Sequence, residues 1–180
     1  WQEEVENDGF NRLIIRANYT WRECQLIRSY AKYIRQLQVT FSQVYMEEVL
    51  AKYPLICHLM IQLFTCQFSP DCKEERDRAR DEILNRIKSL IESVDRSKNY
   101  CEFSEFSENN PKSYISFKID CSSIDEMPLP RPMYEIFVYS SRIEAIHLRG
   151  GKVARGGIRW SDRKEDFRTE ILGLMKAQTV

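Results

Sequence analysis

The hydrophobic residues of this chain change their spacing once, and that change limits the folds it can adopt. In the first half they recur every three or four residues, as in amphipathic helices. From residue 113 onward they alternate with polar residues, as in strands with one buried face. Residues 99–112 between these parts are polar and include Pro111, which is typical of a linker. The pattern predicts an α+β fold with a helical region over 1–98, a linker over 99–112 and a second domain over 113–180.

The first half contains several signals for individual helices. Thr20 and Glu23 have the spacing of a capping box, which predicts that a helix begins at Trp21. Arg28 and other charged residues fall between the apolar positions of this helix, as an amphipathic helix requires. An apolar stripe on a helix usually faces the hydrophobic core, so we expect these helices to pack together. The expected helices cover residues 21–37, 42–53, 54–64 and 71–94.

The second half contains three segments with the alternation of strands. Residues 134–139 and 143–148 are separated by Ser140, Ser141 and Arg142, which predicts an antiparallel hairpin. Another strand is expected over 114–119. The proline-rich stretch over 127–132 cannot continue a strand and is expected to run extended.

Composition excludes several classes of protein. The 27 basic residues balance the 27 acidic ones, so no nucleic-acid partner or anionic membrane is indicated. No apolar run approaches the roughly 20 residues of a membrane span, which predicts a soluble protein. The six cysteines lack C-x-x-C spacing, so we expect no metal site and predict free thiols in a reducing cytoplasm.

The segment over 150–161 is rich in glycine and in positive charge. It contains four glycines and, with Arg149 included, four cationic residues. Glycine lets backbone N–H groups approach a ligand closely, and arginine binds carboxylate or phosphate through two parallel hydrogen bonds. We interpret the segment as an anion-binding loop that precedes a helix capped by Ser161 or Asp162. The apolar face expected for that helix contains Phe167, Ile171, Leu174, Met175 and Gln178.

Two simpler interpretations of the glycine-rich segment stay open at this point. It has the features of an ordinary turn between a strand and a helix, whose arginines meet solvent or acidic side chains such as Asp166 and Glu170. A phosphate-binding module is the other interpretation, although the segment lacks the spacing of a P-loop or of a dinucleotide-binding turn.

Three stretches of the second half are distinctive, namely residues 134–140, the run from His147 to Asp162, and Phe167 to Glu170. These stretches closely resemble the large NAD-specific glutamate dehydrogenases. Residues 18–23 and 41–48 resemble the helical region that precedes the catalytic domain in that family. The resemblance implies that residues 113–180 begin a substrate-binding domain of α/β type.

The family resemblance also implies which residues bind substrate. Glutamate dehydrogenases have a Lys-Gly-Gly-x-Arg segment that helps to hold the substrate carboxylates, and here it is Arg155-Gly156-Gly157-Ile158-Arg159. Arginine replaces the lysine and keeps its positive charge, but a planar guanidinium contacts a carboxylate differently from an ammonium group. By this resemblance Arg155, Gly156 and Gly157 are substrate-binding candidates. Arg159 either joins them or braces the segment.

The implied reaction converts L-glutamate, NAD and water to 2-oxoglutarate, ammonia and NADH, in glutamate catabolism. In the family the catalytic lysine and the NAD-binding Rossmann domain follow the segments seen here, so we expect no catalytic and no cofactor-binding residue in this chain. We therefore expect the 180 residues alone to be inactive. A cytoplasmic homo-oligomer is expected of the whole enzyme, and Lys176, His58 and His147 are expected to have no catalytic role.

One alternative from another class also remains. In it the chain is a non-enzymatic interaction module, in which residues 1–95 form a docking surface and the glycine-rich segment, which binds an anion, serves as a connector. The dehydrogenase hypothesis instead requires a lysine-rich glycine segment and a dinucleotide fold later in the protein.

Overall fold

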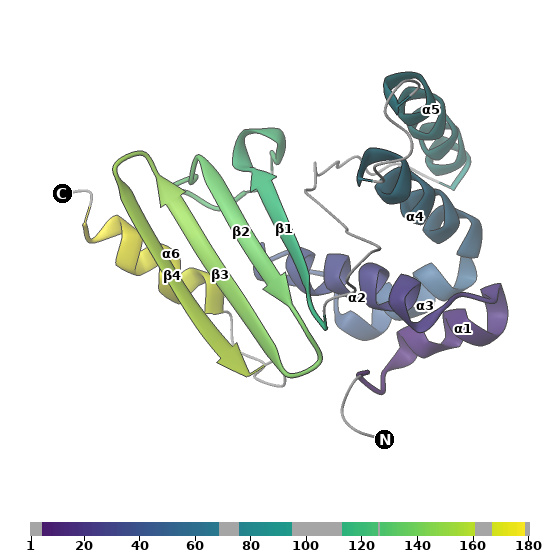
Figure 1. The fold of residues 1–180 in the computed structure, drawn as a ribbon, viewed down its shortest axis with the longest axis horizontal. Coiled ribbons are helices and arrows are strands. Elements are labelled where there is room, and N and C mark those ends of the chain that lie inside the picture. The colour runs from purple at the N-terminus through teal and green to yellow at the C-terminus, as the bar shows by residue number, and fades with distance from the viewer. Residues whose placement is uncertain (1–4, 69–75, 95–112, 126, 161–166, 179–180) are drawn as a thin grey trace.

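The computed structural model has a helical half followed by a four-stranded sheet and a last helix, which confirms the predicted α+β class (Figure 1). It describes all residues except 1–4, 69–75, 95–112, 126, 161–166 and 179–180. The linker expected over 99–112 and the helix cap expected at Ser161 or Asp162 lie outside the described residues.

The helices of the first half begin and end close to their predicted limits. The capping box is present, because the Thr20 backbone N–H donates to Glu23 Oε2 at 2.7 Å and the Glu23 N–H donates to Thr20 Oγ1 at 3.3 Å. Ser42 caps the next helix by accepting from the backbone N–H of Tyr45 at 3.1 Å. Two short elements near the N-terminus, η1 and α1, were not predicted. The elements are η1 (Gly9–Asn11), α1 (Arg12–Ala17), α2 (Trp21–Gln36), α3 (Gln43–Lys52), α4 (Pro54–Phe68) and α5 (Arg76–Val94).

The sheet contains the three predicted strands and one more. Its order is β1-β2-β3-β4, and every neighbouring pair is antiparallel. The predicted hairpin is confirmed between β2 and β3, where the Ser140 backbone N–H donates to the Ile143 carbonyl at 2.9 Å. The strands are β1 (Ile115–Asp120), β2 (Tyr134–Tyr139), β3 (Ile143–Gly150) and β4 (Val153–Trp160), and α6 (Phe167–Lys176) follows them.

The strand β4 replaces the loop that the sequence predicted over 150–161. Only a tight turn at Gly151 and Lys152 separates it from β3, and Gly151 has a φ of +70°, which glycine adopts without strain. The segment pairs with β3 along its whole length, from Gly150 opposite Val153 to Ile143 opposite Trp160. Glycine content suggested a loop, but the backbone hydrogen bonds of an antiparallel ladder do not depend on side chains.

Helices α2 and α6 lie behind one face of the sheet (Figure 1). Tyr30 of α2 stacks on Phe117 of β1, and Tyr33 packs on Phe137 of β2, each with ring centroids 5.3 Å apart. The buried side chains of the helical half and of the sheet form one continuous cluster. The other face of the sheet leaves Ile158 and Trp160 exposed, by 72% and 70%. The α2 helix therefore contributes side chains to the hydrophobic core that covers this face of the sheet.

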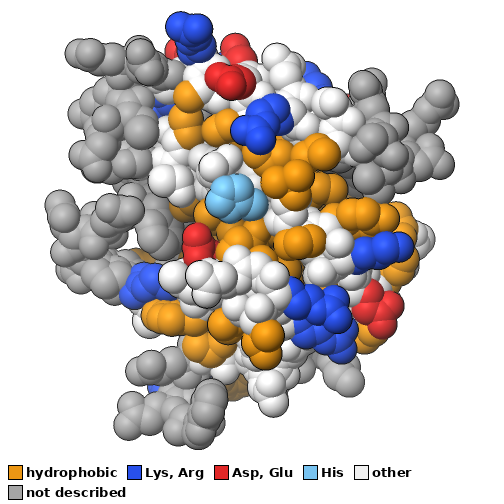
Figure 2. All heavy atoms as spheres, turned by 90° about the vertical axis from the view of Figure 1, so that its right-hand side faces the viewer, with side chains coloured by type: hydrophobic (Ala, Val, Ile, Leu, Met, Phe, Trp, Pro, Cys, Tyr) orange, Lys and Arg blue, Asp and Glu red, His pale blue; other side chains and the backbone are white. Residues whose placement is uncertain are grey.

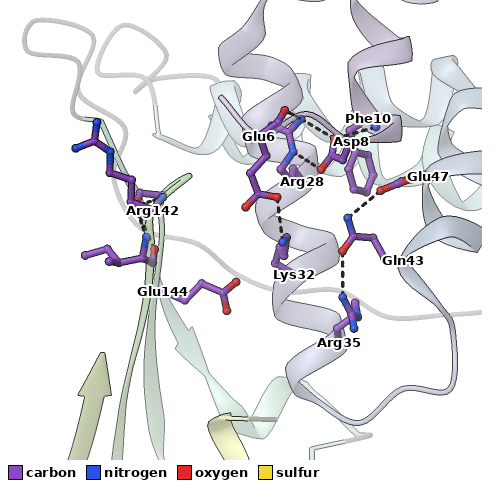
Figure 3. Close-up of polar contacts among 12 residues, drawn as sticks. Glu6, Asp8, Phe10, Arg28, Lys32, Arg35, Gln43, Glu47, Arg142 and Glu144 are labelled. Atoms are coloured by element: carbon purple, nitrogen blue, oxygen red, sulfur yellow. Dashed lines mark hydrogen bonds and ion pairs between the residues drawn. The ribbon is translucent and has the colours of Figure 1, made fainter. Parts of the chain in front are cut away.

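The burial of α2 differs from the prediction at one charged position. Arg28, expected between the apolar positions, is only 1% exposed and binds Asp8 through two hydrogen bonds of 2.7 and 2.8 Å (Figure 3). On the next turn, Lys32 forms an ion pair with Glu6 at 3.0 Å. The N-terminal segment thus supplies a carboxylate that compensates the buried arginine, as a buried charge requires.

The last helix differs from the sequence pattern at two of the five expected positions, because Leu174 is exposed and Gln178 is exposed and lies beyond the end of α6. Phe167, Ile171 and Met175 are buried as expected. Leu172 is buried in place of Leu174, which is 56% exposed, because α6 packs against β3, β4 and α2 together rather than along one narrow stripe. Lys176 lies on the surface, as predicted.

Hydrophobic side chains also gather on the outer side of the helical half, as Figure 2 shows. In the helical half, Ile15 of α1 and Val44 of α3 are 88% and 61% exposed. Within the described residues, no single helix is long and apolar enough to cross a membrane. The helices α3 and α4 pass that test only as a pair, and they are bent by 94° relative to each other.

Candidate substrate site on strand β4

Strand β4 carries all the residues that the sequence predicted to bind substrate. Arg155 lies opposite Leu148 of β3 and its side chain is exposed. Gly156 lies opposite His147 and is also exposed. Among the described strands β4 is at the edge of the sheet, so alternate backbone groups point away from β3. An exposed guanidinium beside accessible backbone N–H groups is suited to bind a carboxylate.

Gly157 faces the opposite way from Gly156, toward α6. A Cβ at this position would lie 2.6 Å from Ile171 Cδ1 and 3.0 Å from Phe167 Cε2. The missing side chain lets α6 approach β4 closely. Packing therefore explains this glycine without reference to a ligand.

Arg159 is buried, in contrast to Arg155. Its Nη2 is 2.9 Å from Glu144 Oε2, and both side chains are almost inaccessible, at 6% and 1%. Its guanidinium carbon also lies 5.3 Å from the centre of the Phe167 ring. Along the strand its Cα is about 13 Å from that of Arg155, so the two arginines occupy different environments.

Glu144 connects this ion pair to the helical half. It points from β3 toward α2 (Figure 3), and Gln36 Nε2 donates to its Oε2 at 3.3 Å. Burial raises the pKa of Glu144, while the hydrogen bond and charge of Arg159 act in the lowering direction. The carboxylate is held by one group from β4 and one from α2.

A second buried ion pair lies next to the first. Arg168, in the first turn of α6, binds Glu135 of β2 through Nε at 3.1 and 3.0 Å and through Nη2 at 2.9 Å. Tyr33 donates to Glu135 Oε2 at 3.3 Å. Burial raises the pKa of Glu135 and Arg168 acts against that rise. The two side chains are 0% and 1% exposed.

The sequence patterns did not predict these buried ion pairs. Glu135 occupies a buried position of β2, where the alternation of the strand predicts an apolar side chain. A carboxylate at such a position is a signal for a charged partner, because a buried charge must be compensated. The identity of that partner, 33 residues further along the chain, depends on the tertiary fold.

The two histidines lie in different parts of the structure, His147 on β3 opposite Gly156 and His58 on α4. His147 and His58 are both exposed, and His58 stacks against Tyr19 with ring centroids 6.5 Å apart. Among the described residues, no group of three or more histidine, cysteine and acidic side chains is placed to hold a metal ion. Four cysteines in the described part of the chain are free and buried, namely Cys24, Cys57, Cys66 and Cys121.

Two family models match the chain, and their ranges meet between residues 70 and 71. Residues 71–180 match "Bacterial NAD-glutamate dehydrogenase, catalytic domain", and residues 5–70 match "Glutamate dehydrogenase, helical motif 3". Every described strand and α6 fall in the first range.

Curated proteins with similar sequences carry the name NAD-specific glutamate dehydrogenase. The protein from Halomonas elongata is 45% identical over 198 aligned positions that include 100% of this chain. Those from Mycobacterium tuberculosis and Pseudomonas aeruginosa are 43% and 42% identical and include 100% and 98% of it. The chain spans 12% of the length of each of these relatives.

Proposed function

Because this chain belongs to the bacterial NAD-glutamate dehydrogenase family, we propose that it contributes the first part of a substrate site to an enzyme that oxidises L-glutamate. The enzyme would convert L-glutamate, NAD and water to 2-oxoglutarate, ammonia and NADH, in glutamate catabolism. The observation that carries the proposal is the exposed Arg155 beside Gly156 at the edge of β4.

In this proposal Arg155 binds one substrate carboxylate. Its guanidinium offers two parallel N–H donors to a carboxylate. The neighbouring Gly156 is exposed, and β4 is at the edge of the described sheet. Arg159 has a different role. Its buried ion pair with Glu144 supports the bracing role that the sequence left open, in which Arg159 fixes the end of β4.

The remaining parts of the catalytic machinery belong, in this proposal, to other parts of the enzyme. NAD supplies the acceptor for the hydride, and a Rossmann domain outside this chain would bind it. The helical region over 1–98 would precede the catalytic domain, with a linker over 99–112. The 180-residue chain by itself is then expected to be inactive and to bind no NAD.

We also propose that the whole enzyme is a cytoplasmic homo-oligomer. The four buried, free cysteines of the described residues are consistent with a reducing compartment. The exposed hydrophobic side chains on the outer side of α1 and α3 offer a surface for subunit contacts. Light scattering of the full-length enzyme measures its oligomeric state, and a monomer would contradict this part of the proposal.

The substrate site can be tested with Arg155→Ala in the full-length enzyme. Removal of a charge-assisted hydrogen bond is expected to raise the glutamate KM about ten- to a hundredfold, with a smaller effect on kcat. Lys152→Ala is the matched control, because Lys152 is also an exposed cation but lies in the turn before β4. Equal KM values for Arg155→Ala and the unchanged enzyme would refute the assignment. If the full-length protein without substitutions does not reduce NAD in the presence of glutamate, the interaction-module alternative is favoured.

A further inference from the structure

We propose that Tyr33 and Gln36, in the helical half, are positioning residues that set how strongly β4 binds the substrate carboxylate. The proposal rests on the function proposed above, in which Arg155 of β4 binds that carboxylate. Tyr33 and Gln36 lie almost one turn apart on α2, so they face the same side of the helix. That side contacts both buried ion pairs of the sheet.

Gln36 joins three elements through one side-chain amide. Its Nε2 donates to Glu144 Oε2 on β3 at 3.3 Å. Its Oε1 accepts from the backbone N–H of Arg168 at 3.2 Å, in the first turn of α6. Gln36 is 5% exposed, so water cannot readily replace either partner. The amide thus fixes β3 and the beginning of α6 relative to α2.

Tyr33 acts on the neighbouring ion pair. Its hydroxyl donates to Glu135 Oε2 at 3.3 Å, and this carboxylate binds the guanidinium of Arg168. The Tyr33 side chain is 1% exposed, and its ring packs on Phe137. Tyr33 and Gln36 therefore hold the first turn of α6 in two ways, through the side chain and through the backbone of Arg168.

The backbone ladder with β3 holds β4 in register, and side-chain contacts set its position relative to α2 and α6. In the described structure it pairs with β3 on one side only. Its central residues, Gly156 and Gly157, have no side chains that could interlock with neighbours. The ion pair of Arg159 with Glu144 and the packing of α6 on Gly157 are its main side-chain restraints. Tyr33 and Gln36 support both of these restraints from α2.

A change at either position is expected to act through the buried carboxylates. A buried polar network has little tolerance for a missing partner, because the remaining group must move or stay poorly solvated. Loss of the Gln36 amide leaves Glu144 with one described partner fewer and releases the first turn of α6. Arg159 and β4 then shift with Glu144, and Arg155 is held less accurately.

The primary test is the pair Gln36→Leu and Tyr33→Phe in the full-length enzyme. Each variant keeps the buried volume and removes hydrogen-bonding groups. The glutamate KM is expected to rise about two- to tenfold, the factor expected for a hydrogen bond of ordinary strength. The kcat is expected to change by less than about twofold, because the affected contact is made equally in the ground state and in the transition state.

Gln25→Leu is the matched control. Gln25 is on the same helix and is also 5% exposed, but it lies about 16 Å from Gln36 along the helix axis. Its substitution removes an equally buried amide without touching either ion pair, so the glutamate KM is expected to stay unchanged. A general loosening of α2 would raise the KM in this variant as well and would contradict the proposal.

A second measurement tests the route through Glu144. In a Glu144→Leu background, Gln36→Leu is expected to raise the glutamate KM less than it does in the enzyme with Glu144, because the acceptor of the Gln36 amide is already absent. Full additivity of the two changes would overturn the route. If Gln36→Leu does not give folded enzyme, Tyr33→Phe decides alone, since it removes only one hydroxyl group and keeps the ring packing.

The outcomes separate this inference from the function on which it rests. Arg155→Ala with a raised KM, together with an unchanged KM in Gln36→Leu and Tyr33→Phe, would overturn only the positioning role. An unchanged KM in Arg155→Ala would overturn the proposed substrate site and this inference with it. A kcat that falls while the KM stays constant in the α2 variants would also reject the positioning role.

Discussion

The substitution Arg168→Met tests most directly how the sheet and the helices are held together. It removes the cation that compensates Glu135 of β2. The Glu135 side chain is 0% exposed and contacts Tyr33 of α2 and Arg168 of α6. Breaking a fully buried ion pair by removal of one partner costs about 3–5 kcal/mol, because the other charge stays buried. Since a domain is stable by only about 5–15 kcal/mol, this loss is a large fraction of the free energy of unfolding.

The pH dependence of this loss has a defined sign. Burial raises the pKa of Glu135, and Arg168 opposes that rise. Without Arg168 the pKa of Glu135 rises further. A carboxyl whose pKa is raised by folding stabilises the fold below its unfolded pKa, and that contribution is lost as pH rises through the folded pKa. The deficit of Arg168→Met is therefore expected to shrink as the pH falls toward about 4.3, the ordinary value for glutamate.

Urea unfolding of the 180-residue chain, followed by circular dichroism at several pH values, measures this effect. With a slope of about 1–3 kcal/mol per molar urea, the midpoint at pH 7 is expected to fall by about 2 M. The double variant Arg168→Met/Glu135→Leu is expected to recover most of the loss, because apolar residues often replace a buried pair without cost. A loss below about 1 kcal/mol, or one that grows at low pH, would refute the reasoning.

Two further predictions concern packing and thiol reactivity. Gly157→Ala is expected to destabilise the chain by about 1–3 kcal/mol in urea unfolding, because its Cβ would meet Ile171 and Phe167. Gly173→Ala is expected to stabilise it by about 0.5–1 kcal/mol, because no neighbouring group lies within 4 Å of a Cβ at that helical position. Equal effects of the two changes would contradict this account. Burial raises the pKa of Cys24 to about 11 and that of Cys121 to about 12, so iodoacetamide at pH 8 is expected to alkylate them only in urea. Mass spectrometry of each site measures the labelling, and fast reaction in the folded chain would argue against the burial.

Local patterns in the sequence predicted most of the secondary structure. The capping box of Thr20 and Glu23 marked the beginning of α2, and the spacing of polar residues around 140 marked the hairpin of β2 and β3. These signals are reliable because a helix cap and a hairpin turn depend on residues that are neighbours in the chain. The same local patterns did not predict β4, because Gly156 and Gly157 have no side chains and interrupt the alternation of apolar and polar residues that indicates a strand.

The sequence by itself determined the α+β class, the helix limits and, through family resemblance, the candidate residues Arg155, Gly156, Gly157 and Arg159. Only the tertiary structure decided which of these arginines is exposed. Arg155 and Arg159 have the same side chain, but only Arg159 is buried, in an ion pair with Glu144. The partners of such a buried pair come from segments that folding brings together, and their spacing along the chain follows no local period. The desolvation of charge therefore depends on the whole fold.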